Sequence, residues 1–77
     1  MTQSQLTDLL IARLVRDHGG SRQLWRRLVG QVRLYSEQTH PHCNWTLNPS
    51  GNPAQIRAIE QLLDDIRQTH PIIRSDR

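Results

Sequence analysis

Three histidines and one cysteine are the residues of this chain best suited to hold a metal ion. His40, His42 and Cys43 lie close together, and His70 follows later in the chain. Imidazole and thiolate groups are preferred zinc ligands, and three or four of them can close a tetrahedral site. The spacing of these four residues matches no standard zinc module. We therefore expect no metal, and keep His40, His42, Cys43 and His70 as the weaker alternative.

All ten basic residues are arginines, and the formal net charge at pH 7 is +3. A guanidinium group is planar and permanently charged, which suits contacts with carboxylates and phosphates. Arg22, Arg26 and Arg33 fall within about 40 degrees of one another if residues 21–35 form one helix. This arginine stripe is the predicted partner-binding side. A protein partner is the first expectation, and a nucleic acid is the alternative.

A second candidate site surrounds the turn before the last predicted helix. Main-chain N–H groups at a helix start attract anions, and Ser50, Gly51 and Asn52 stand at such a start. Arg74 would join them if the two predicted strands lie side by side, because ligands collect beyond the carboxyl ends of strands. We favour the competing interpretation that Asn52 and Gln55 use those N–H groups as ordinary helix caps.

No pair of residues shows a spacing that catalysis requires. His42 and Cys43 are neighbours, so their side chains would point to opposite faces of a strand. Asp64 and Asp65 are neighbours on a predicted helix and lie about 100 degrees apart, which is poor geometry for paired acid and base groups. We therefore expect a protein without enzymatic activity and without a cofactor.

Length and composition indicate a single small domain over residues 1–77, with residues 75–77 as a frayed tail. A single cysteine excludes an internal disulfide, and the first apolar run lacks the basic flank of a signal peptide. No run approaches the roughly 18 to 20 apolar residues of a membrane span. We expect a soluble, cytoplasmic protein without membrane contact. The sequence leaves its oligomeric state open.

Three amphipathic segments predict three helices. Leu6, Leu10 and Leu14 share one side of the first, which Gly19 and Gly20 should end. Asn52, followed by Pro53 and by Gln55 in a capping box, predicts the start of the third helix. The second helix is expected to begin after Ser21 and to include Gly30. Its apolar arc consists of Leu24, Trp25, Leu28, Val32 and Tyr35.

The tetrapeptide Gln-Thr-His-Pro occurs at residues 38–41 and again at 68–71. Proline disfavours helical backbone in the residue before it, so both copies are predicted to end a helix. The alternating run 43–48 and the apolar run 71–74 are predicted strands. A strand, a helix and a second strand form a crossover unit, which is parallel in most proteins.

We therefore expect an α+β domain of order α-α-β-α-β with a short two-stranded parallel sheet. A three-helix bundle is the alternative, in which the two runs are merely extended. The predicted core consists of Trp25, Trp45, Leu47, Ile59, Leu63 and Ile72.

Overall fold

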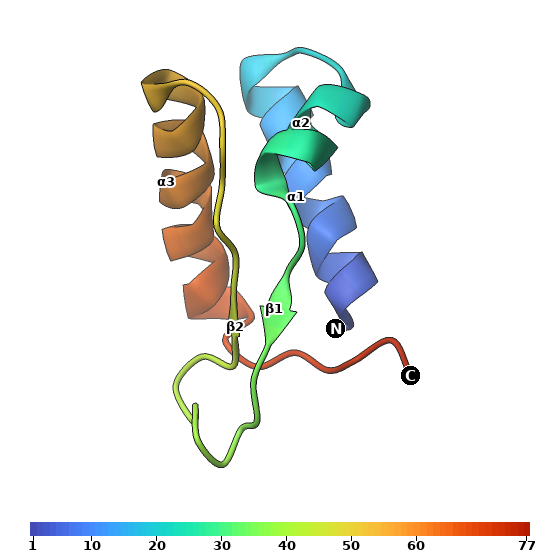
Figure 1. Cartoon of the computed structure of the whole chain (residues 1–77), viewed down its shortest axis with the longest axis vertical. Helices are drawn as coiled ribbons and strands as arrows, with labels where there is room; N and C mark the ends of the chain where they lie inside the picture. The colour runs from blue at the N-terminus through green and yellow to red at the C-terminus, as the bar shows by residue number, and fades with distance from the viewer.

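The structure is a computed structural model that describes all residues from 1 to 77 (Figure 1). Each of its three helices begins at a capping side chain. Helix α1 spans Gln3–His18, α2 spans Arg22–Val29 and α3 spans Pro53–Thr69. The predicted capping box of α3 is confirmed, since Gln55 N–H donates to Asn52 Oδ1 at 2.8 Å and Asn52 N–H to Gln55 Oε1 at 2.9 Å. Thr2 and Gln5 form a second capping box, on α1, which was not predicted from the sequence.

Helix α2 is shorter than predicted, because it ends at Gly30 and does not continue to Tyr35. Gly30 has φ 71° and ψ −154°, a backbone conformation that is open to glycine and strained for other residues. The chain therefore leaves the helix there, and Val32 enters the core from the connection that follows. Val32 and Tyr35 had the spacing of a helix, but they do not belong to one.

The sheet is antiparallel, so the prediction of a parallel sheet was wrong. Strand β1, Arg33–Leu34, pairs with β2, Trp45–Thr46, in the register Arg33 to Thr46 and Leu34 to Trp45. The element order is α-α-β-β-α, which differs from both the α-α-β-α-β order and the three-helix bundle. The first Gln-Thr-His-Pro lies in the loop between the strands, and only the second ends a helix, since α3 stops at Thr69.

The C-terminal segment lies against the hairpin but adds no strand to its ladder. The side-chain amide of Asn44 donates to the Ile73 carbonyl at 2.7 Å and accepts from the Ile73 N–H at 2.9 Å. Asn44 N–H also donates to the Pro71 carbonyl at 3.0 Å. One residue further on, Arg74 forms an isolated parallel bridge with Thr2, before α1. The predicted proximity of residues 44 and 71–74 is thus present, made mostly by a side chain.

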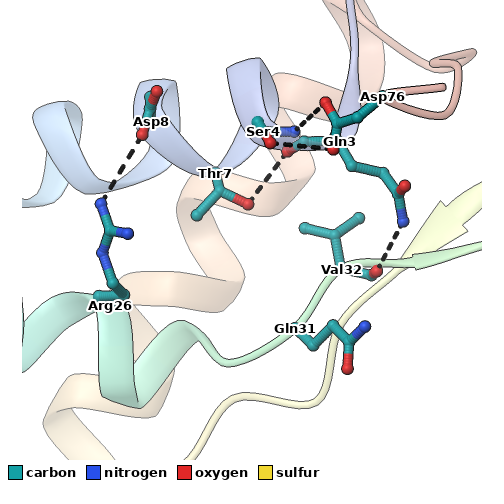
Figure 2. A pocket seen from close by; sticks show the side chains of 8 residues that line it. All are labelled: Gln3, Ser4, Thr7, Asp8, Arg26, Gln31, Val32 and Asp76. Atoms are coloured by element: carbon teal, nitrogen blue, oxygen red, sulfur yellow. Dashed lines mark hydrogen bonds and ion pairs between the residues drawn. The ribbon is translucent and has the colours of Figure 1, made fainter.

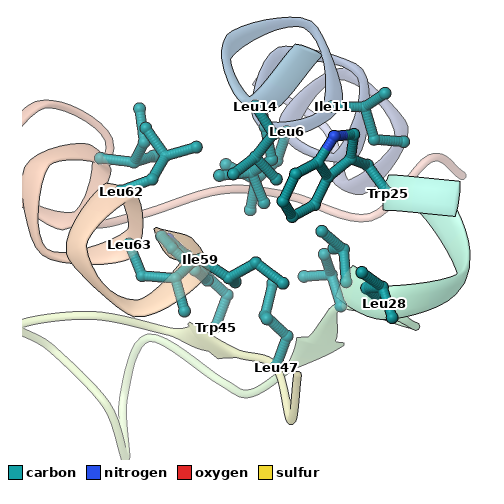
Figure 3. Close-up of a cluster of buried hydrophobic side chains, with 14 of the residues drawn as sticks. Leu6, Ile11, Leu14, Trp25, Leu28, Trp45, Leu47, Ile59, Leu62 and Leu63 are labelled. Carbon is teal, nitrogen blue, oxygen red and sulfur yellow. The ribbon is translucent and has the colours of Figure 1, made fainter. Parts of the chain in front are cut away.

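The core fills the space between the three helices and the hairpin (Figure 3). Both tryptophans are buried and hydrogen-bonded, as Trp25 Nε1 donates to the Gly19 carbonyl at 2.7 Å and Trp45 Nε1 to the His70 carbonyl at 2.9 Å. The predicted core is confirmed except at Ile72, which is half-buried while Ile73 is buried. The buried hydrophobic residues are Leu6, Leu10, Ile11, Leu14, Trp25, Leu28, Val29, Val32, Trp45, Leu47, Ile59, Leu62, Leu63, Ile66 and Ile73.

Replacing Asn44 with alanine is expected to lower the free energy of unfolding by about 2 to 4 kcal/mol, because the buried N–H and carbonyl of Ile73 would lose their partner. Urea denaturation of the variant measures this loss. Asn48 is exposed, so Asn48→Ala is the matched control and should change the stability by less than about 0.5 kcal/mol. Equal stabilities of the two variants would contradict the role given to Asn44.

Gly30→Ala is expected to destabilise the domain by about 1 to 3 kcal/mol through the backbone alone. A Cβ atom at this position would meet no heavy atom within 4 Å, so a steric clash contributes nothing. Thermal unfolding followed by circular dichroism measures the change. An unchanged or increased stability would show that α2 tolerates continuation into residue 30.

Candidate partner-binding surface

The exposed side of α2 carries three arginines, Arg22, Arg26 and Arg27, and the helix contains no acidic residue. Its other side is buried through Trp25, Leu28 and Val29. The chain has ten arginines and seven acidic residues, so removing these three arginines leaves seven against seven. The whole net charge of +3 therefore equals the charge of this eight-residue helix.

Arg33 does not belong to this side, so the predicted stripe of Arg22, Arg26 and Arg33 on one helix was wrong. Arg33 is exposed on β1, where it pairs in register with Thr46. The helix ends at Gly30, and Arg27 is the third arginine of α2. The glycine inside the apolar pattern was the signal in the sequence that could have separated Arg33 from the other two.

A polar groove separates the start of α1 from the connection between α2 and β1 (Figure 2). Its volume is about 250 Å³. Arg26 and Gln3 stand at opposite ends in Figure 2, and Gln3 Nε2 donates to the Val32 carbonyl at 3.1 Å. The guanidinium of Arg26 lies 3.9 Å from the Asp8 carboxylate, a long contact between two exposed side chains that contributes little. The lining residues are Gln3, Ser4, Thr7, Asp8, Arg26, Gln31, Val32 and Asp76.

The C-terminal tail reaches this groove through Asp76. Its carboxylate accepts from Ser4 N–H at 3.2 Å and from the Ser4 hydroxyl at 2.9 Å. The hydroxyl of Ser4, followed by that of Thr2 and the Ser4 N–H, holds the pKa of Asp76 below its ordinary value of 3.8. Fraying of residues 75–77 stays a prediction, while Asp76 is bonded to α1 in the structure.

The structure does not bring the four predicted anion-binding residues together. Ser50, Gly51 and Asn52 precede α3, whereas Arg74 lies beyond its far end, beside Thr2 (Figure 1). Their predicted proximity depended on two parallel strands ending at the same edge of a sheet, and the observed antiparallel hairpin has no such edge. At the helix start, Asn52 Oδ1 already accepts the Gln55 N–H, which agrees with the capping interpretation that we favoured.

The structure does not group the three histidines and the cysteine into a metal site, since no three or more His, Cys, Asp or Glu side chains are placed to hold a metal ion. His40 stacks on Tyr35 in the hairpin loop, with ring centroids 4.4 Å apart. His70 follows α3, and its carbonyl accepts from Trp45. Cys43 is half-buried, and its thiol donates to the Trp45 carbonyl at 3.4 Å. His42 is exposed.

No protein-family model, curated protein or solved structure matches the chain. None of the three helices combines the length and the apolar character that crossing a membrane requires.

Asp76→Asn is expected to lower the stability at neutral pH, because ionised Asp76 is bonded to Ser4 in the folded chain. Its folded pKa lies below 3.8, so this contribution is present above 3.8 and disappears as the pH falls through the folded value. Urea denaturation of both proteins between neutral and strongly acidic pH measures the difference. A difference that persists at the acidic end would contradict the assignment.

Proposed function

We propose that this chain is a non-catalytic protein-interaction module that binds an acidic partner protein through the exposed side of α2. The observation that carries the proposal is the segregation of charge, because the protein is neutral outside α2 and carries its excess on Arg22, Arg26 and Arg27. Apart from the long contact between Arg26 and Asp8, no ion pair occupies these arginines. They are free to pair with carboxylates of a partner.

A protein is favoured over a nucleic acid by the size and composition of this surface. An eight-residue helix is about 12 Å long, so its three arginines reach few phosphates. Single-stranded nucleic acids also need aromatic side chains on which bases stack. The exposed aromatic residue is Tyr35, which lies on the hairpin loop and already stacks on His40. Nucleic-acid binding through the same arginines remains the second candidate function.

The proposal of a module without catalysis agrees with the roles that the reactive side chains have in the fold. The thiol of Cys43 is directed to the Trp45 carbonyl, and Cys43 packs against the core. Asp64 is paired with Arg67 at 3.6 Å. The guanidinium of Arg67 also lies over the ring of Trp45, 5.4 Å from its centroid. Cys43 and Arg67 thus have contacts within the domain, whereas the exposed pair of Asp64 with Arg67 contributes little to stability.

The triple variant Arg22→Gln, Arg26→Gln and Arg27→Gln is expected to bind an oligoglutamate peptide about tenfold or more weakly than the wild type. The matched control replaces three exposed arginines elsewhere, by Arg16→Gln, Arg57→Gln and Arg77→Gln. It has the same net charge and should retain binding within about twofold. Isothermal titration calorimetry at two salt concentrations measures all three proteins, and capture of cell-lysate proteins compares the same variants.

Equal losses in the two variants would mean that only net charge matters, and would refute a binding surface on α2. The same titrations with duplex DNA and with RNA decide between the two candidate functions. Tighter binding of a nucleic acid than of the acidic peptide, with loss confined to the α2 variant, would favour the nucleic-acid module.

A further inference from the structure

We infer that the acidic partner of α2 carries one large apolar side chain, which enters a hollow beside Trp25. This hollow lies between the turn from α1 to α2 and the start of α3, away from both chain termini (Figure 1). Its apolar wall consists of Leu24, Trp25, Ala54 and Ala58. The inference rests on the proposed function and names a feature of the partner that the arginines alone do not select.

The first observation is charge complementarity. The surface has four hollows, and the one beside Trp25 is the only one whose lining includes no carboxylate. Asp8 and Asp76 line the groove of Figure 2. Glu37 lines a third hollow, and Asp65 lines the fourth. An acidic segment therefore meets a like charge in every hollow except the one beside Trp25.

The second observation is the place of this hollow relative to the arginines. Leu24 lies in its wall, and Arg27 follows Leu24 by three residues on α2. Side chains three residues apart are neighbours on the surface of a helix, and about 4.5 Å of helix axis separates them. A segment that pairs with Arg27 therefore has the hollow within one helical turn.

The hydrogen bonds of the lining favour an apolar occupant. Trp25 Nε1 donates to the Gly19 carbonyl at 2.7 Å, so the indole offers only its ring to the hollow. The side-chain oxygens of Asn52 and Gln55 accept main-chain N–H groups at the start of α3, at 2.8 Å and 2.9 Å. A polar side chain would give up its hydrogen bonds to water for few partners here, whereas an apolar side chain gives up none.

The volume of the hollow, about 310 Å³, leaves room for one large side chain such as phenylalanine. Ala54 and Ala58 stand one turn apart on α3 and do not fill it. Gly20 lies against the indole, where an added Cβ atom would come within 3.3 Å of Trp25 Nε1. Exposed ion pairs contribute little by themselves, so an anchor in this hollow would supply much of the affinity.

The carboxylates of the segment belong on the α2 side of its apolar residue. The neighbouring hollow shares His18 and Ala58 with this one, and Asp17 and Asp65 also line it. Carboxylates of the partner on that side would be repelled. The fitting segment thus has its acidic residues to one side of the anchor.

The probes are capped peptides that carry four glutamates next to a terminal phenylalanine, in both chain directions, and the same peptides with alanine in place of phenylalanine. In the direction that binds more tightly, phenylalanine should strengthen binding about tenfold over alanine, because one large apolar side chain is buried. Titration calorimetry measures the affinities. Nitrogen-15 NMR should show that phenylalanine shifts the indole N–H of Trp25 and leaves that of Trp45, which bonds to the His70 carbonyl, unchanged.

One variant and its matched control test the position of the anchor. Ala54→Leu fills the hollow from α3 and should abolish the advantage of phenylalanine, while the affinity for the alanine peptide stays within about twofold. Ala54 is exposed and leucine is a good helix former, so the fold should be retained. Ala12→Leu changes an exposed position of α1 outside the hollow and should keep the advantage. If Ala54→Leu does not fold, the comparison of the two peptides on the wild type decides alone.

Equal affinities for the phenylalanine and alanine peptides, or an advantage that survives Ala54→Leu, would overturn the inference and leave the binding side of α2 intact. Equally tight binding of a phenylalanine peptide with glutamines in place of glutamates would overturn the acidic character of the segment. A dimer that forms without peptide and that Ala54→Leu dissociates would assign the hollow to a second copy of the chain, and would also overturn the inference. Failure of the α2 triple variant to differ from its charge-matched control would instead refute the proposed function.

Discussion

The buried amide of Asn44 is the interaction on which the arrangement of this domain depends. Asn44 is the single buried polar residue, and its side chain pairs with both main-chain groups of Ile73. Its own carbonyl accepts from Tyr35 N–H at 2.7 Å, so one residue joins β1, β2 and the C-terminal segment. That segment continues to Arg74, whose N–H donates to the Met1 carbonyl at 2.9 Å. The position of α1, and of the groove beside it, follows from this chain of contacts.

The hairpin has too few main-chain hydrogen bonds between its strands to be stable by itself. Side-chain contacts with the rest of the domain are therefore needed to hold it. Each strand has two residues, and an isolated two-stranded hairpin is marginal in water. Trp45 supplies the missing stabilisation, because its ring packs in the core while its indole N–H bonds to the His70 carbonyl beyond α3. The hairpin is therefore held by its contacts with the helices and the tail.

Local features of the fold could be predicted from the sequence, and long-range pairing could not. The start of α3 was predictable because Asn52, Pro53 and Gln55 act within one helical turn. The prediction of a parallel sheet failed because the packing of the whole domain decides which strands pair. Strands of two residues also leave almost no hydrophobic periodicity in the sequence. The repeated Gln-Thr-His-Pro strengthened the wrong topology, although its first copy lies in the hairpin loop.

For the arginines of the candidate binding surface, too, local features were predictable and long-range ones were not. Arg22 and Arg26 were predicted correctly to be exposed on the second helix, since their spacing is local. Arg33 was misplaced because its position depended on where that helix ends. The neutrality of the chain outside α2 is a property of the sequence, but it becomes visible only when Gly30 is known to be the boundary.

The domain separates the residues that hold its fold from those that are free to bind. Asn44, Trp25 and Trp45 have their polar groups satisfied within the chain, so any change at these positions acts through stability. The arginines of α2 lie at the surface, opposite a buried side that fixes the helix in place. Because the buried side fixes the helix, less conformational entropy is lost when the exposed arginines bind a partner.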